Sequence, residues 1–567
     1  MACLRGEHLS FNRIVRGSGG ALARGLYKAC GHTDRDLAMP LIGIANSWNT
    51  VTPGHVTLDT LGKAVAEGIR EAGGMAVEFG TIGPCDGIAQ GHEGMRYILP
   101  SRDIIAASVE LMVRAHGFDG VVLLGSCDKI VPGMLMAAAR LDIPAIFMNA
   151  GPMEPGHYRG EDVDVNLIAE AMGRVEAGTM SEAELTVIEN SATPGPGSCT
   201  MIGTANTMCC FAEALGMALP GTAAVPAVHA RRREIAAETG RQIVSLVQSG
   251  ITARQVITHG AILNGIRFVL AIGGSTNAVL HIPAIAGDAG IEGVRLELFD
   301  ELARKTPLVA KIISASKYDM VDFFEAGGVT AVMKAIEPLL DGAAMTVSGR
   351  TVKENLARFA FTSRPEVIRS LEAPYSPEGG LAVLKGNLAP KGSIAKPSAI
   401  PEHLRTFRGP CRIYNGEDEA NRAILAGCVR EGEVVVIRYE GPKGGPGMPE
   451  LFLAQKYLES VGLSQSVGLI TDGRFSGSSR GLFVGHISPE AAEGSALALL
   501  ADGDMVQIDI PGRRLEAEVS AEEFARRREA WKRPLRPVRP GFLSLYAQLS
   551  TSADEGAVLR LPGSNKE

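Results

Sequence analysis

The stretch Gly120–Asn149, GVVLLGSCDKIVPGMLMAAARLDIPAIFMN, contains the pattern that decides the fold. Gly120–Leu124 is a short apolar run typical of a buried strand, Pro132–Arg140 follows as a helical segment, and Ile143–Asn149 is a second strand-like run. A strand, a helix and a strand in this order predict a βαβ unit with parallel strands. Because similar alternation extends from about residue 40 to residue 290, the sequence predicts an α/β fold with a parallel sheet in its N-terminal domain.

Two Cys-Asp dipeptides follow predicted strands of this domain. Cys85-Asp86 comes after the apolar run Met75–Ile82, and Cys127-Asp128 comes after Gly120–Leu124. Ligands bind at the carboxyl ends of strands in such sheets, which is where both pairs fall. Thiolates select iron–sulfur clusters or zinc, whereas carboxylates select magnesium or manganese. The two pairs therefore indicate two different metal centres next to each other.

A third cysteine, Cys199, has the same Gly-Ser lead-in as Cys127 and would complete a set of three thiolates. A closed structural zinc or cluster site needs four protein ligands, so three thiolates leave one metal position free for a substrate. A cysteine beside a strand is more often a small buried apolar residue than a ligand. We assign that role to the cysteines without such a setting, which are Cys3, Cys30, Cys209, Cys210, Cys411 and Cys428.

Length and composition narrow the class of protein. The 567 residues are too many for one ordinary core, so two or three domains are expected. The net charge of -7 argues against a nucleic-acid partner, because such binding needs a basic face. No apolar run reaches the ~18 residues of a membrane span. The start of the chain has no apolar signal core, so we expect a cytoplasmic protein that does not bind membranes.

The pattern changes near Ala373–Gly380, where proline and glycine interrupt the chain. Short strand-like runs separated by glycine-rich loops follow, for example Glu433–Tyr439 and Ser466–Thr471. We therefore expect residues 1–372 to form the N-terminal α/β domain that binds the cluster and metal. Residues 381–567 are expected to form a C-terminal β-rich, barrel-like domain that completes the active site.

Two loops of the second domain contain candidate polar groups. The loop Glu440–Glu450 is glycine-rich, but Lys443 is not followed by Ser or Thr, so we reject a nucleotide phosphate loop. The loop Thr471–Gly481 places Ser476 between glycines and near two arginines. A polar turn is the simplest interpretation of this second loop when it is taken alone.

Several motifs, in order along nearly the whole chain, resemble the dihydroxy-acid dehydratase and phosphogluconate dehydratase family. They are Asn46–Asn49, the two Cys-Asp loops, Pro132–Met134, Gly197–Cys199 with Thr204–Met208, Gly273–Asn277, Glu440–Glu450 and Asp472–Gly477. The resemblance implies an iron–sulfur hydro-lyase that dehydrates a 2,3-dihydroxy carboxylic acid to a 2-keto acid. It also implies an active site between an N-terminal α/β domain and a C-terminal barrel-like domain, and a homodimer or a dimer of dimers.

The resemblance also implies roles for individual residues. The cluster would be held by Cys85, Cys127 and Cys199. Mg²⁺ would be held by an oxygen-rich set, which comprises Asp86, Asp128, Glu450 and a carbamylated Lys129. Ser476 and the modified Lys129 are the catalytic candidates, with Ser476 as the base that takes the C2 proton. A serine hydroxyl is a weak base, so its alkoxide would need stabilisation by the metal, Arg474 or Arg480.

The choice of cluster type rests on one difference between this chain and the two-iron members of the family. Members of the family with a two-iron cluster have cysteine where this chain reads Thr52–His55, and Gly54 cannot supply a side-chain ligand. Cys85 supplies the missing thiolate, an arrangement that resembles the phosphogluconate dehydratase branch. We therefore favour [4Fe-4S] over the alternative [2Fe-2S]. His55 could add a ligand or a substrate contact.

The resemblance is nearest to the dihydroxy-acid dehydratase branch of valine and isoleucine biosynthesis, in part because of Leu545–Val558. A sugar-acid (aldonate) dehydratase is the alternative, and Cys85 favours it. An alkyl substrate needs apolar walls beyond C3, whereas a polyol needs hydrogen-bonding groups, so the lining of the pocket separates the two hypotheses. A non-catalytic iron–sulfur sensor is a remote alternative, because such proteins usually close the cluster with a fourth protein ligand.

Overall fold

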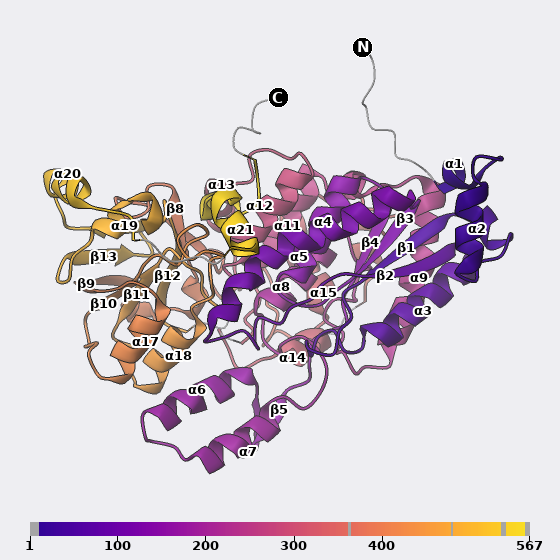
Figure 1. The fold of residues 1–567 in the computed structure, drawn as a ribbon. Helices are drawn as coiled ribbons and strands as arrows, with labels where there is room; N and C mark the ends of the chain where they lie inside the picture. Colours follow the sequence, from indigo (N-terminus) through magenta and orange to yellow (C-terminus); the bar gives the residue numbers. More distant parts are fainter. Residues whose placement is uncertain (1–10, 314, 361–363, 478–479, 535–539, 562–567) are drawn as a thin grey trace.

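The structure is a computed structural model that describes residues 11–313, 315–360, 364–477, 480–534 and 540–561. Its N-terminal and C-terminal halves lie side by side, with the parallel sheet of the first half and the larger sheet of the second half at opposite ends of the molecule (Figure 1). The predicted α/β fold with two sheet regions is confirmed.

The N-terminal sheet has the strand order β2-β1-β3-β4, and all of its pairs are parallel. Its strands are β1 (Leu41–Asn46), β2 (Met75–Gly80), β3 (Gly120–Leu124) and β4 (Ala145–Met148). Every residue of β1 and β3 is buried, as expected for a parallel sheet with both faces covered. The predicted βαβ unit is β3, the helix α5 (Ile130–Leu141) and β4.

Helices pack around this sheet, among them α3 (Leu58–Glu71) and α9 (Arg231–Ser249), which contact each other and the strands. The remaining helices of the first half are α1 (Phe11–Val15), α2 (Ala21–Ala29), α4 (Ile98–His116), α6 (Val165–Glu176), α7 (Glu182–Ala192), α8 (Thr204–Ala214), α10 (Ala253–Val256), α11 (His259–Ala271), α12 (Ala278–Asp288), α13 (Leu296–Ala303), α14 (Met320–Glu325), α15 (Gly328–Ala335) and α16 (Val352–Arg358). The hairpin of β5 (Gly156–Tyr158) and β6 (Glu161–Val163) precedes α6, and together with α6 and α7 it forms a projection from the body of the protein (Figure 1).

The C-terminal sheet has the strand order β14-β13-β9-β10-β11-β12-β8-β7. Its strands are β7 (Ala382–Leu384), β8 (Gly392–Ala395), β9 (Thr406–Tyr414), β10 (Val434–Ile437), β11 (Gly468–Thr471), β12 (Leu482–Ser488), β13 (Met505–Asp509) and β14 (Arg514–Ala517). The run from β9 to β12 is parallel, and the flanking strands are antiparallel. Lys385, next to β7, exchanges backbone hydrogen bonds of 3.0 and 2.8 Å with Arg513 and Leu515 at the other edge. The sheet therefore nearly closes into a barrel.

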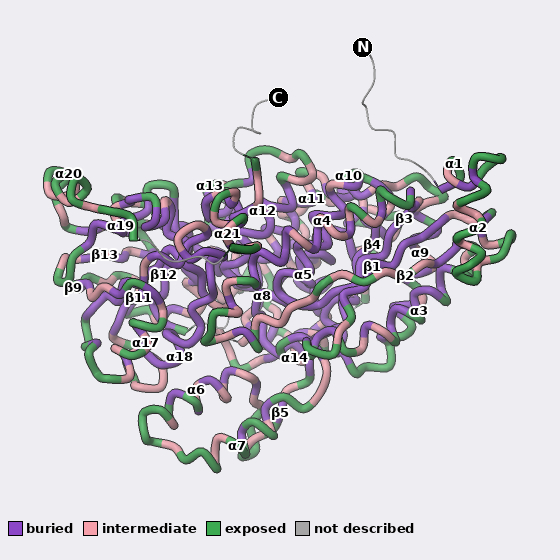
Figure 2. The backbone as a smooth tube through the Cα atoms, viewed as in Figure 1, coloured by how far each residue is buried: buried purple, intermediate pink, exposed green. Residues whose placement is uncertain are grey.

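The helices of the second half are α17 (Glu417–Leu425), α18 (Phe452–Ser460), α19 (Ala496–Leu499), α20 (Ala521–Ala530) and α21 (Phe542–Leu549). The segment around α21 returns to the first half, where Arg102 Nη2 donates to the Ala557 carbonyl at 2.8 Å. Figure 2 shows that burial follows both sheets and the helices between them, whereas α20 is exposed. We propose a domain division between residues 372 and 381, after α16 and before β7. Among the described residues, no helix is long and apolar enough to cross a membrane.

Candidate active site

Three carboxylates meet where the two halves join. Asp86 and Asp128 come from the loops after β2 and β3, and Glu450 comes from the loop before α18. One oxygen from each of the three lies within 4.8 Å of the others. Two of these loops meet because parallel strands end at the same edge of a sheet, and the second half brings the third. The predicted carboxylate set is therefore assembled in space.

The electrostatics of this set suit a divalent cation. Burial raises the pKa of Asp86 well above its usual value, and the neighbouring carboxylates Asp128 and Glu450 raise it further. A cation among the carboxylates would offset that repulsion, and oxygen donors are the ligands that Mg²⁺ prefers. The residues present therefore fit Mg²⁺.

Lys129 is the residue before α5, and only 1% of its surface is exposed. Its Nζ lies 2.6 Å from Asp128 Oδ2. Burial lowers the pKa of Lys129, and the Arg474 guanidinium lowers it further. An uncharged amine is the form that reacts with carbon dioxide, so this environment is compatible with the carbamylation that the resemblance implies.

Arg474 is directed toward the Glu450 side of the site. Its Nη1 forms an ion pair with Glu450, and its Nε donates to the Met448 carbonyl at 2.8 Å. Asn277 Nδ2 also donates to Glu450 Oε2 at 3.3 Å. The second arginine that the sequence singled out, Arg480, is exposed and lines a different cavity of about 310 Å³.

The three predicted cysteine ligands lie near enough to one another to affect each other's ionisation. Burial raises the pKa of Cys85 to about 11, and burial together with neighbouring thiols and carboxylates raises the pKa values of Cys127 and Cys199. Cys199 is exposed and lines a cavity. Thiols in this setting stay protonated unless a cation stabilises the thiolates, so the donor set fits an iron–sulfur cluster.

Position 54 borders the same space. A Cβ atom added to Gly54 would lie 2.8 Å from Cys127 Sγ and 3.3 Å from the Ser198 nitrogen. A cysteine at this position would therefore point toward the sulfur atoms, as the resemblance to two-iron members implies. Gly54 has no side chain, so in this chain any thiolate ligand must come from the other cysteines.

His55 is not available as a ligand, contrary to the suggestion from the sequence. Its Nδ1 donates to the Ser47 carbonyl at 2.8 Å, and its Nε2 accepts from the backbone nitrogens of Ser126 and Cys127 at 3.2 and 3.3 Å. Burial lowers its pKa to about 4, so the ring is neutral. Both nitrogens are engaged, and His55 holds the Cys127 loop in place.

One cavity of about 210 Å³ brings most of these groups together. Its polar lining includes Asp86, Asp128, Cys199, Glu450 and Ser476. The rest of its wall includes apolar side chains of two helices, Val165, Ile168, Ala169 and Met172 from α6 and Phe452 and Leu453 from α18. The sequence did not indicate this apolar wall, because its members are almost 300 residues apart and each reads as an ordinary core position.

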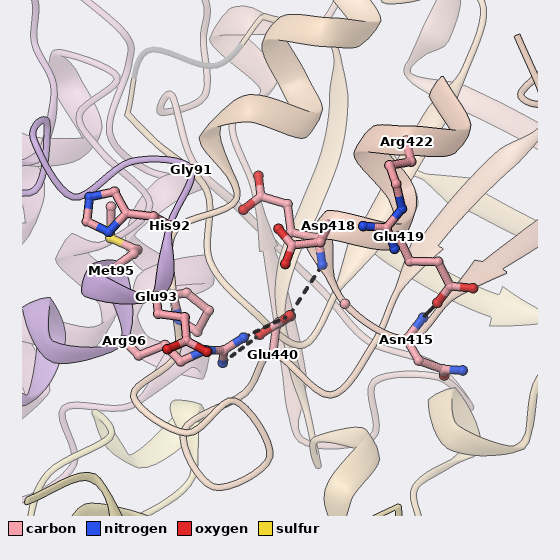
Figure 3. A pocket seen from close by; sticks show the side chains of 13 residues that line it. Gly91, His92, Glu93, Met95, Arg96, Asn415, Asp418, Glu419, Arg422 and Glu440 are labelled. Carbon is pink, nitrogen blue, oxygen red and sulfur yellow. Dashed lines mark hydrogen bonds and ion pairs between the residues drawn. The ribbon is translucent and has the colours of Figure 1, made fainter. Parts of the chain in front are cut away.

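A second cavity, of about 380 Å³, borders the loop that carries Glu450 (Figure 3). There Arg96 of the first half forms an ion pair of 3.1 Å with Glu440 and also donates to the Gly445 carbonyl. The backbone nitrogen of Glu417 donates to the same Glu440 at 3.3 Å. Arg96 thus fixes the Glu440–Glu450 loop across the junction of the halves, a role that the sequence did not reveal.

Both halves of the chain match a family of dehydratases. Residues 39–355 match the N-terminal part of the dihydroxy-acid/6-phosphogluconate dehydratases, and residues 366–557 match their C-terminal part. The chain belongs to the dihydroxy-acid/6-phosphogluconate dehydratase family, as its motifs predicted.

Relatives along the whole chain carry a more specific name. The chain is 51% identical to a dihydroxy-acid dehydratase of Pyrococcus furiosus over 549 residues, which are 96% of this chain and 99% of the relative. It is 50% identical to one of Methanothermobacter thermautotrophicus over 547 residues, with the same two shares. It is 47% identical to one of Ruminiclostridium cellulolyticum over 549 residues, again with 96% and 99% covered.

Proposed function

We propose that this chain is a dihydroxy-acid dehydratase, a hydro-lyase that converts a branched 2,3-dihydroxy carboxylic acid to a 2-keto acid. The apolar wall formed by α6 and α18 carries this proposal, because it faces the same cavity as the carboxylates and Ser476. The alkyl end of a branched substrate can pack against Met172 and Leu453 without leaving a polar group unpaired. Each hydroxyl of a sugar acid left unpaired there would cost about 1–3 kcal/mol. The names of the full-length relatives support the same substrate class.

Two groups of residues would bind the two metal centres. The three cysteines would hold the cluster, and Asp86, Asp128, Glu450 and a carbamylated Lys129 would hold Mg²⁺. When bound, the two metal centres supply Lewis acidity that neutralises charge developing on the substrate oxygens.

The cluster type and the assembly stay predictions from the sequence. We propose [4Fe-4S] as the cluster because Gly54 offers no thiolate while Cys85 does, and iron content per chain tests this choice. We propose a homodimer or a dimer of dimers, which the mass in solution tests by light scattering. A cytoplasmic location also stays a prediction, for cell fractionation to test.

The substrate class can be tested with an anaerobic activity panel. The reconstituted protein is expected to dehydrate 2,3-dihydroxyisovalerate and to leave several aldonates largely unconverted, because their hydroxyls would face the α6 and α18 side chains. Replacing Leu453 by Ser should lower kcat/KM for the branched substrate while retaining the cluster. Preferential turnover of an aldonate by the unmodified protein would reject the branched-acid assignment.

Replacing Ser476 by Ala tests the proposed base. Ser476 lines the cavity beside the carboxylates, where it can reach a bound substrate. A group that takes a proton in the transition state contributes ~10²–10⁴-fold to the rate and little to substrate binding. We expect kcat to fall at least about a hundredfold on that scale, with iron, Mg²⁺ and KM near the wild-type values. Near-wild-type kcat with intact metals would show that another group is the base.

A further inference from the structure

Lys396 is a buried lysine beside the loop that carries Ser476. It directly follows β8 in the barrel, and only 5% of its surface is exposed. Its Nζ donates a hydrogen bond of 2.9 Å to the carbonyl of Gly477, the residue after Ser476. Burying an ammonium group costs free energy unless hydrogen bonds and charges compensate it, so its position at this loop calls for an explanation.

The carbonyls on both sides of Ser476 are held by side chains from different halves of the protein. Asn277 Nδ2 of the first half donates to the Phe475 carbonyl at 3.3 Å, and Lys396 of the barrel donates to the Gly477 carbonyl. The loop also runs tightly against the first half, since a Cβ atom on Gly477 would lie 2.9 Å from Gly203 Cα. The backbone of Ser476 is therefore fixed from both sides.

A charge on Lys396 would act at the same loop, because its Nζ contacts the carbonyl of the residue next to Ser476. Burial lowers its pKa to about 7, so it holds its proton less firmly than an exposed lysine does. A nearby anion favours the charged form of a lysine, and the lysine in turn favours the anion. A serine alkoxide is an anion of this kind, and it needs such stabilisation in order to act as a base.

We propose that Lys396 is a positioning residue for Ser476, which fixes its loop through the Gly477 carbonyl and favours the alkoxide over the hydroxyl. This inference rests on the proposed role of Ser476 as the base. It adds a second requirement for proton removal, supplied by the barrel and separate from the metal ligands.

Lys396→Met, Lys396→Arg and the control Lys391→Met test the proposal in the reconstituted holoenzyme. Lys391 is exposed and precedes the same strand. Small displacements of a reacting group can cost about a hundredfold, so we expect kcat of Lys396→Met to fall about ten- to a hundredfold. KM, iron and Mg²⁺ content should stay near wild type. The isotope effect with C2-deuterated substrate should increase, because proton removal becomes more rate-limiting.

The same series of variants separates the effect of losing the charge from an effect on folding. Lys396→Arg retains a cation and is expected to recover most of the rate, whereas Lys391→Met should match wild type. If Lys396→Met does not fold, Lys396→Gln keeps a donor without the charge and is expected to be slow as well. Wild-type kcat and isotope effect in the neutral variants would overturn the proposal, and so would an Arg variant as slow as Met.

Measuring Ser476→Ala beside these variants distinguishes a failure of the base assignment from a failure of the proposed role of Lys396. If Ser476→Ala loses turnover while Lys396→Met keeps it, the inference about Lys396 fails and the assignment of the base stands. If Ser476→Ala keeps turnover with intact metals, the assignment of the base fails and the role of Lys396 fails with it. Loss of turnover in both, with the rate recovered in Lys396→Arg, supports both.

Discussion

Replacing Cys127 by serine is expected to abolish both the iron–sulfur absorbance and the activity. Cys127 is buried against the other two cysteines, and a serine oxygen is a much poorer ligand for iron than a thiolate. Its loop is held independently by His55, so the substitution should leave the fold intact. We expect the variant to retain less than about a tenth of the wild-type iron after anaerobic reconstitution, on the scale of losing a metal ligand. Iron and sulfide content and absorbance measure this without reference to turnover.

Cys85→Ser and Cys199→Ser should give the same loss, whereas Cys428→Ser is the matched control. Cys428 is an exposed cysteine of the barrel, so its serine variant should keep full iron and activity. Full iron and activity in the Cys85 variant would remove Cys85 from the ligand set. An iron-to-protein ratio near two in the wild type would instead reject the four-iron cluster while keeping the three ligands.

The sequence was most informative where local pattern and topology coincide. The βαβ unit was predictable because β3 and β4 are short continuous apolar runs, and its parallel strands bring Asp86 and Asp128 to one sheet edge. Strand β9 was not recognised, because Gly409 and Pro410 are both uncommon inside strands. The overall α/β and barrel-like organisation was therefore predictable, and so were barrel strands such as β10 and β11, whereas β9 was not.

The supporting residues of the site were not predictable from local pattern. His55, Arg96 and Lys396 act through carbonyls or amides of loops that are distant in sequence. Nothing in the residues around Lys396 marks it as buried beside Ser476. Their roles depend on how the two halves pack, and that information lies in tertiary contacts rather than in spacing. The ligand candidates themselves carried a signal, because cysteine and aspartate side by side after a strand are uncommon.

Replacing Glu450 by Gln is expected to remove both Mg²⁺ dependence and turnover while leaving the cluster absorbance largely intact. Glu450 supplies one of the three converging carboxylates, and an amide is a much weaker Mg²⁺ ligand than a carboxylate. The variant also leaves the Arg474 guanidinium buried without its charged partner. Breaking a buried ion pair in this way costs about 3–5 kcal/mol, so the metal-free variant should unfold at a lower temperature than wild type.

Asp86→Asn separates the loss of a metal ligand from the loss of an ion pair. The neighbouring carboxylates Asp128 and Glu450 repel Asp86, and burial disfavours its charge. The amide relieves that repulsion, so metal-free Asp86→Asn should be at least as stable as wild type even though it too loses Mg²⁺ affinity and turnover. Exposed Glu431→Gln serves as the control and should change neither property. Magnesium titration and thermal unfolding of the metal-free proteins measure the two effects separately. If Glu450→Gln kept wild-type Mg²⁺ affinity and rate, the second half of the chain would not contribute to the metal site, and the carboxylates of the first half would have to bind the cation alone.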